Sequence, residues 1–210
     1  MRTRGFVAVF AIMLNVVFCP FVMADIFGSW DVGGRMKTKV KIKGYGSDSV
    51  KEYVYDLFEF GEDGNFSTLD FDQARWEYGK KKVFVYFDTK ELSLFFEQEL
   101  EDLFWTETGY DVDVYDVTIV KNVLYAKEKK NESIKGKWKL VFTCRMNIDY
   151  AEILNIKTWV KYGFTGTRHA PPTTLSEQRA LSEGGDSLST LSEAIEAQVL
   201  NRVFEFLPEK

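Results

Sequence analysis

The stretch Lys137-Trp-Lys-Leu-Val-Phe-Thr-Cys-Arg-Met-Asn-Ile148 alternates between two kinds of side chain. Its even positions, from Trp138 to Ile148, are all apolar, whereas its odd positions are mostly charged or polar. Successive side chains of a β-strand point to opposite faces, so this period of two predicts a strand with one buried face. An earlier segment repeats the pattern. Between Trp30 and Ile42 the even positions are mostly apolar, and the odd positions from Arg35 to Lys43 are basic.

Alternating runs separated by turn residues extend outward from these two segments, over residues 30–164. The turn Gly61-Glu-Asp-Gly64 contains Asp-Gly, a strong hairpin signal. We therefore expect a mainly β fold, an antiparallel up-and-down barrel of about 8–10 strands, because closure leaves no exposed edge. Two consecutive strands are expected over residues 112–120 and 123–127. Gly33-Gly34 interrupts the first strand and predicts a bulge or a sharp bend.

Two segments depart from the period of two and predict helices. Residues 92–96 are expected as a strand, followed by a short mid-chain helix over residues 97–106, where apolar residues recur at helical spacing. Near the C-terminus, Thr190 and Glu193 form a capping box before an amphipathic helix that ends at Pro208. This helix, from Leu191 to Leu207, is expected to pack on the outer wall of the barrel or to act as a lid or partner-binding element. Its apolar stripe consists of Leu191, Ile195, Val199, Val203 and Phe206.

The first 24 residues have the pattern of a secretory signal peptide, with Arg2 and Arg4 before an apolar run and Val22-Met-Ala24 before the expected cleavage site. This predicts an exported protein, periplasmic or extracellular, without a transmembrane span after cleavage. An uncleaved membrane anchor and a lipoprotein acylated at Cys19 are the alternatives. The expected organisation is a signal peptide (1–24), a barrel domain (25–168), a flexible linker (169–187) and the C-terminal helix (188–210).

Composition and motif spacing argue against several function classes. The chain has 27 Lys and Arg against 32 Asp and Glu, a net charge of −5. No basic stripe along the sequence follows a nucleic-acid backbone, so nucleic-acid and other polyanion binding is disfavoured. The single histidine, His169, lies in the polar tail, and Cys144 belongs to an apolar row, which leaves little support for a nucleophile–base pair.

Metal and carboxylate chemistry has equally little support. No Cys/His spacing suits zinc, and Asp111-x-Asp113-x-x-Asp116 lacks the glycine of a calcium loop. The acidic residues between positions 97 and 102 follow one another along a short segment, which favours a solvated face over an acid–base pair. We therefore expect no enzymatic activity, no metal and no cofactor.

The expected inner rows are rich in aromatic side chains, because the chain contains 18 Phe and 10 Tyr. A barrel of about eight strands is either filled by side chains or holds one small ligand. The candidate lining of a pocket for a small hydrophobic, lipid-like ligand combines soft apolar atoms with isolated hydroxyls: Met36, Thr38, Phe142, Cys144, Met146, Thr158 and Tyr162. The alternative is a filled barrel acting as an envelope-associated interaction or scaffold protein, with the C-terminal helix as its docking element.

Two segments begin with the same motif, Ile-x-Gly-x-Trp, at positions 26–30 and 134–138. Such a motif suits the closed end of a small barrel, so Gly28, Trp30, Gly136 and Trp138 are expected to build its floor. The export signal, Gly28-x-Trp30 at the first strand, the meander and Arg168 near the last strand resemble the calycin superfamily of lipocalins and bacterial lipocalin-like proteins. The resemblance implies non-covalent carriage of a hydrophobic molecule and packing of Arg168 across Trp30.

Overall fold

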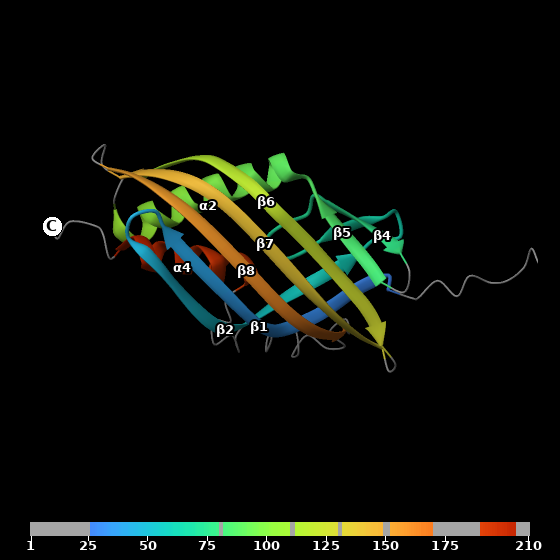
Figure 1. Cartoon of the computed structure of the whole chain (residues 1–210). Helices are drawn as coiled ribbons and strands as arrows, with labels where there is room; N and C mark the ends of the chain where they lie inside the picture. Colours follow the sequence, from blue (N-terminus) through green and yellow to red (C-terminus); the bar gives the residue numbers. More distant parts are fainter. Residues whose placement is uncertain are drawn as a thin grey trace, which may run out of the picture.

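Eight antiparallel strands form a ring in the computed structural model, each strand beside the next and the last beside the first (Figure 1). The structure describes residues 26–79, 82–109, 112–129, 132–148, 152–169 and 190–204. The strands are β1 Gly28–Ile42, β2 Gly46–Phe60, β3 Asn65–Ser67, β4 Ala74–Gly79, β5 Lys82–Phe87, β6 Val112–Lys129, β7 Ser133–Ile148 and β8 Glu152–Arg168, and the helices are α2 Thr89–Thr108 and α4 Leu191–Phe204. The expected mainly β, up-and-down fold with a mid-chain and a C-terminal helix is confirmed.

Three expected segments fall wholly or largely outside the described residues. They are the signal peptide (1–24), the linker (169–187) apart from His169, and the end of the C-terminal helix after Phe204. The domain boundaries proposed for these segments stay predictions.

The buried rows of the long strands follow the expected parity. In residues 30–42 of β1 and 154–166 of β8 the even positions are buried and most odd positions face the solvent. Register with β2 and β8 is continuous along β1, so of the bulge or sharp bend expected at Gly33-Gly34 the bulge is wrong. Gly34 has a different role, because a Cβ at this position would lie 2.1 Å from the carbonyl oxygen of Gly163 in β8. The glycine therefore allows two backbones to approach closely.

β6 is one long strand instead of the two that were expected. It pairs with β7 along its length, with register shifts between Tyr115 and Thr118 and between Ile119 and Lys121. These irregularities interrupt the alternation of buried and exposed side chains, which is why the sequence suggests two strands.

Strand pairing completes the ring at only one end. β3 pairs with β2 only through Glu59 and Phe60, and β5 pairs with β6 only through residues 83–85. The other half of β6 packs against α2, where Glu101 Oε1 accepts a hydrogen bond of 2.8 Å from the backbone N–H of Val114. α4 packs against β1, β2 and α2 at the same end (Figure 1). The ring is therefore closed by strands at one end and plugged by helices at the other.

α2 begins earlier than expected and includes residues 92–96, which the alternation assigned to a strand. Leu92 and Phe96 are also four residues apart, and both are buried with Leu100 and Phe104, whereas Leu94 is 47% exposed. The period that describes this segment is therefore helical. Asp88 accepts hydrogen bonds from two N–H groups of the first turn, and this N-cap determines where the helix starts.

α4 has the expected capping box, in which Thr190 N–H donates to Glu193 and Glu193 N–H donates to the Thr190 hydroxyl. Its position differs from the expectation. Ile195, Val199 and Val203 are completely buried, and the helix lies against β1, β2 and α2 at the plugged end. The expectation that this helix packs on the outer wall is wrong, because the short strands β3, β4 and β5 leave an apolar opening that the helix covers.

Candidate functional site

The seven predicted ligand-binding residues lie in the inner rows of β1, β7 and β8, and all are at most 3% exposed. Phe96 of α2 lies on the inner side of this sheet, next to one of these residues. The ring of Phe96 stacks on that of Phe142, with centroids 4.8 Å apart and an interplanar angle of 11°. The residues are therefore packed in a core. Their role in ligand binding stays a prediction.

A small cavity between the helices and the sheet has a volume of about 30 Å³. Its lining includes Phe87, Phe96, Trp138 and Ile195, and none of the seven predicted residues. A cavity of this kind needs roughly 10–15 Å³ to hold one water, so this cavity has room for a few waters at most and is far below the few hundred Å³ of a typical ligand site.

Asp56 lines the same cavity and is a buried ionisable group that the sequence analysis did not single out. Its Oδ1 atom accepts hydrogen bonds from the N–H groups of Leu57 (2.8 Å) and Leu69 (3.1 Å). Burial, with a smaller contribution from the charge of Asp70, raises the pKa of Asp56 to about 7. An aspartate at an even position between Val54 and Phe58 was the available signal, because those neighbours belong to the inner row of β2.

The strand-closed end is built around Trp30, which is completely buried. Its indole N–H donates a hydrogen bond of 2.8 Å to the carbonyl of Ile26. Arg168 is the register partner of Trp30, and its guanidinium lies 4.7 Å from the indole centroid while donating to the carbonyl of Phe27. Gly28 lies beside this contact with a φ of 99°, a conformation that favours glycine.

The second Ile-x-Gly-x-Trp motif has another environment. The Trp138 indole N–H donates a hydrogen bond of 2.6 Å to Asn122, and its ring stacks on Phe87 with centroids 5.6 Å apart. Trp138 lines the cavity next to α2 and α4, so its expected place in the floor beside Trp30 is wrong. Gly136 makes room for an aromatic ring, because a Cβ there would lie 2.2 Å from Phe164 Cζ.

The outer face of β1, β7 and β8 carries ten outward-facing cationic side chains, four on β1, four on β7 and two on β8. We name this set the cationic wall: Arg35, Lys37, Lys39, Lys41, Lys135, Lys137, Lys139, Arg145, Lys157 and Lys161. Among the side chains described on these three outer faces, Asp31 is the single carboxylate, and it lies 2.8 Å from His169 Nδ1. The sequence analysis disfavoured polyanion binding because it found no basic stripe along the chain. The structure has a basic surface that runs across neighbouring strands, which the order of residues along the chain does not reveal.

The strand register places four lysines side by side across four strands. Lys37 of β1 is opposite both Lys51 of β2 and Lys161 of β8, and Lys161 is opposite Lys139 of β7. Because neighbouring strands are about 4.8 Å apart, this lysine row extends roughly 14 Å. Like charges directly opposite one another destabilise a sheet. The stability of the fold therefore does not account for the row.

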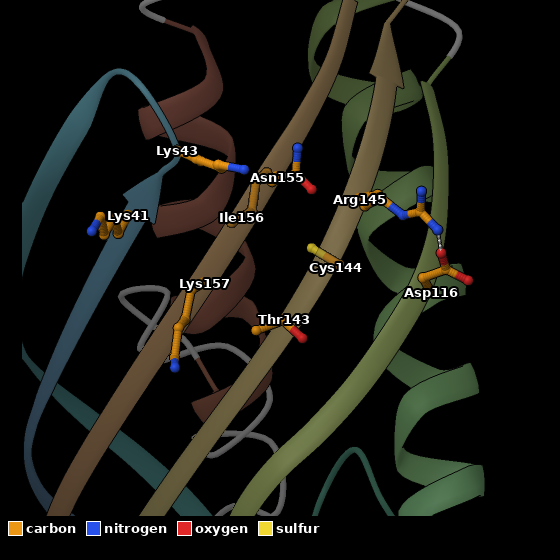
Figure 2. A pocket seen from close by; sticks show the side chains of 9 residues that line it. All are labelled: Lys41, Lys43, Asp116, Thr143, Cys144, Arg145, Asn155, Ile156 and Lys157. Carbon is orange, nitrogen blue, oxygen red and sulfur yellow. Dashed lines mark ion pairs between the residues drawn. The ribbon is translucent and has the colours of Figure 1, made fainter.

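A shallow hollow of about 420 Å³ lies on the same face (Figure 2). Its polar lining includes Lys41 and Lys157, which are opposite each other in the register, together with Lys43 and Arg145. The Arg145 guanidinium forms an ion pair with Asp116 and lies 5.0 Å from the ring centroid of Tyr115. The lysine side chains spread over the face and do not converge on one point (Figure 2).

Trp159 provides an aromatic centre for the cationic wall. It is half-buried, and the ammonium groups of Lys39 and Lys157 lie 5.7 Å and 5.2 Å from its ring centroid. Its register partners are Lys39 on one side and Val141 on the other. The centre of the cationic wall therefore combines an aromatic ring with charged groups, and the surrounding positions are basic.

Charge of the opposite sign gathers elsewhere in the chain. Residues 56–107 contain fourteen Asp and Glu against five Lys and Arg. This segment includes β3, β4, β5 and α2, and β4 stands four positions from β8 in the ring of eight strands. Acidic side chains are therefore concentrated on β3, β4, β5 and α2, outside the three strands of the cationic wall.

No protein-family model matches this chain, and no curated protein matches it either. Among solved structures, that of Ail, the attachment invasion locus protein of Yersinia pestis, is similar over 67% of this chain and 99% of that chain. The sequence identity is 11% and the TM-score is 0.21, a likeness that carries no argument about function. The antiparallel meander, one of the features on which the calycin resemblance rests, is present and closes in a ring of eight strands, and no family is assigned to the chain.

Two further observations concern the described residues alone. None of the helices in that part of the chain is both long and apolar enough to cross a membrane. The same residues contain no group of three or more His, Cys, Asp or Glu side chains that could hold a metal ion.

Proposed function

We propose that this chain is an exported, non-enzymatic binding protein that recognises an anionic partner through the cationic wall. The observation that carries the proposal is the row formed by Lys51, Lys37, Lys161 and Lys139. Neighbouring strands in this row are about 4.8 Å apart, less than the Debye length of about 8 Å at physiological salt, so the fields of the lysines they carry overlap. An anionic partner would relieve the repulsion between them, which gives a reason for the row that fold stability does not.

The interior supports this choice of surface. A ligand inside the ring would have to displace Phe96, which stacks on Phe142, or Ile195 of α4. Both side chains are at most 1% exposed, and moving a buried large apolar side chain into water costs about 1.5–3 kcal/mol. The C-terminal helix is equally unsuited as a docking element, because its apolar row from Ile195 to Val203 is buried against the ring. Binding through the cationic wall requires neither the displacement of an interior side chain nor the release of α4.

The test uses heparin, a sulfated polysaccharide, as a polyanionic probe for the mature chain. The variant Lys37→Gln/Lys139→Gln/Lys161→Gln removes three members of the lysine row. The matched control, Arg75→Gln/Lys82→Gln/Lys90→Gln, removes the same charge from β4, β5 and α2. We expect the wild type and the control to elute from immobilised heparin at similar salt concentrations, and the row variant to elute much earlier.

Two results would contradict the proposal. One is that the wild type does not bind heparin even at low salt, near 0.05 M, where surface charges are only weakly screened. The other is an equal loss of binding in the row variant and in the control, because net charge alone would then explain the retention.

A further inference from the structure

We infer that the partner of the cationic wall is an anionic lipid surface, whose phosphate-bearing head groups the lysines contact. This inference rests on the proposed function and narrows it to one class of partner. Three features carry it: the spread of the charges, the aromatic centre and the position of the acidic segment.

The charges are distributed as a two-dimensional array. Across the sheet, the lysine row covers four strands, and along β1 the cations continue from Arg35 to Lys41. Six residues of strand span about 20 Å, so the array measures roughly 20 Å by 14 Å. The hollow within it is open, and Lys41, Lys43 and Lys157 point in different directions there (Figure 2). A single small anion would contact only part of such an array, whereas an extended surface of phosphates can contact several of its strands at once.

The centre of the array suits the boundary between head groups and acyl chains. Trp159 is half-buried, with Val141 as one register partner and with the ammonium groups of Lys39 and Lys157 over its ring. Tryptophan is enriched where a polar surface meets a membrane, because the indole has an apolar body and one polar N–H. Lysine side chains can rest their methylene groups beside the indole while the ammonium groups remain at the level of the phosphates.

The charge distribution orients the molecule on such a surface. β4 lies across the ring from β8, within the segment 56–107 that has nine more acidic than basic residues, fourteen against five. A negatively charged membrane attracts the cationic wall and repels the acidic segment, so one orientation is favoured although the net charge of the chain is −5.

A nucleic acid is the other large anion that a basic face can bind, and the observations favour it less. The N-terminal signal predicts export. Eight of the ten cations in the wall are lysines, which act as point charges, whereas arginine is preferred for forked recognition of phosphates and bases. Nucleic-acid binding therefore enters as an outcome of the test.

The experiment measures co-sedimentation of the mature chain with phosphatidylcholine vesicles and with vesicles containing roughly one-third phosphatidylglycerol. We expect binding to the anionic vesicles only, and weaker binding as salt increases. Each lysine near an anionic membrane surface contributes about fivefold in affinity, so Lys37→Gln/Lys139→Gln/Lys161→Gln should lower affinity roughly 100-fold. The control Arg75→Gln/Lys82→Gln/Lys90→Gln should bind like the wild type.

A second variant tests the aromatic centre separately. Trp159→Ala leaves every charge in place, and we expect it to weaken binding severalfold with an unchanged dependence on salt. Far-UV circular dichroism of each variant establishes that it is folded. Unchanged affinity of a folded Trp159→Ala protein would contradict contact between the indole and the membrane.

Other outcomes would overturn the inference as a whole. Equal binding to neutral and anionic vesicles, or equal losses in the row variant and its control, would exclude recognition of anionic lipid by the wall. Failure to bind either vesicle, with heparin binding retained, would leave the proposed function in place and reject the lipid partner. Tighter binding to a DNA duplex than to the anionic vesicles at the same salt would identify nucleic acid as the partner class.

Discussion

Replacement of Asp56 by asparagine should change how the stability of this protein depends on pH. Burial raises the pKa of Asp56 to about 7 in the folded protein, against an ordinary value of 3.8. Between these two values the folded protein retains a proton that the unfolded chain releases. The contribution of Asp56 to stability is therefore fully present at low pH, and it is lost as the pH rises towards 7.

The size of the effect follows from the pKa difference. One pKa unit corresponds to about 1.4 kcal/mol, so a shift of roughly three units lowers stability by about 4 kcal/mol between acid and neutral pH. The asparagine side chain of the Asp56→Asn variant retains an oxygen that can accept from Leu57 and Leu69, and it does not ionise. Because about two of these roughly three units lie between pH 5 and the pKa of Asp56, we expect the variant to gain about 2–3 kcal/mol relative to the wild type between about pH 5 and pH 8.

Urea denaturation of the wild type and Asp56→Asn at several pH values measures this difference directly. The comparison cancels the contributions of the other carboxylates, which are the same in both proteins. A difference in unfolding free energy that does not change with pH would show that Asp56 is not buried in ionisable form beside the cavity, and the account of this residue would then be wrong.

Two further changes test the interior and the lysine row. Phe96→Ala removes the ring that stacks on Phe142. It should cost about 3–5 kcal/mol in denaturant unfolding and leave an apolar cavity to which benzene binds, raising the melting temperature; no response to benzene would indicate that the site collapses. Lys161→Gln removes the lysine that faces both Lys37 and Lys139. It should stabilise the protein by about 0.2–1 kcal/mol at low salt, and a gain that persists in concentrated salt would rule out charge repulsion as the cause.

Alternation of side chains was a reliable guide wherever a strand has two different faces. β1 and β7 each have an apolar inner row and a basic outer row, so their parity and their place in a ring could be predicted. Alternation misled at residues 92–96, where a short apolar run fits both a strand and a helix until the cap at Asp88 is considered. It also failed at the β6 bulges, because an extra residue reverses the face of those that follow.

The candidate site was predictable only in part. The seven residues proposed as a pocket are in the inner rows, as their parity requires, but whether a ring contains space depends on what fills it. Here α2 places Phe96 against Phe142, and α4 buries Ile195 beside the cavity. The alternation of side chains within one strand does not indicate whether a helix from another part of the chain packs against its inner face.

The sequence by itself determined most of the strands, the parity of their faces and the capped start of α4, because these depend on neighbours within a few residues. The tertiary structure decided how far the ring is filled and which charges lie together. Lys37, Lys139 and Lys161 are far apart along the chain and become neighbours through strand register alone. Register depends on every pairing in the ring at once, so the cationic wall exists only in the folded protein.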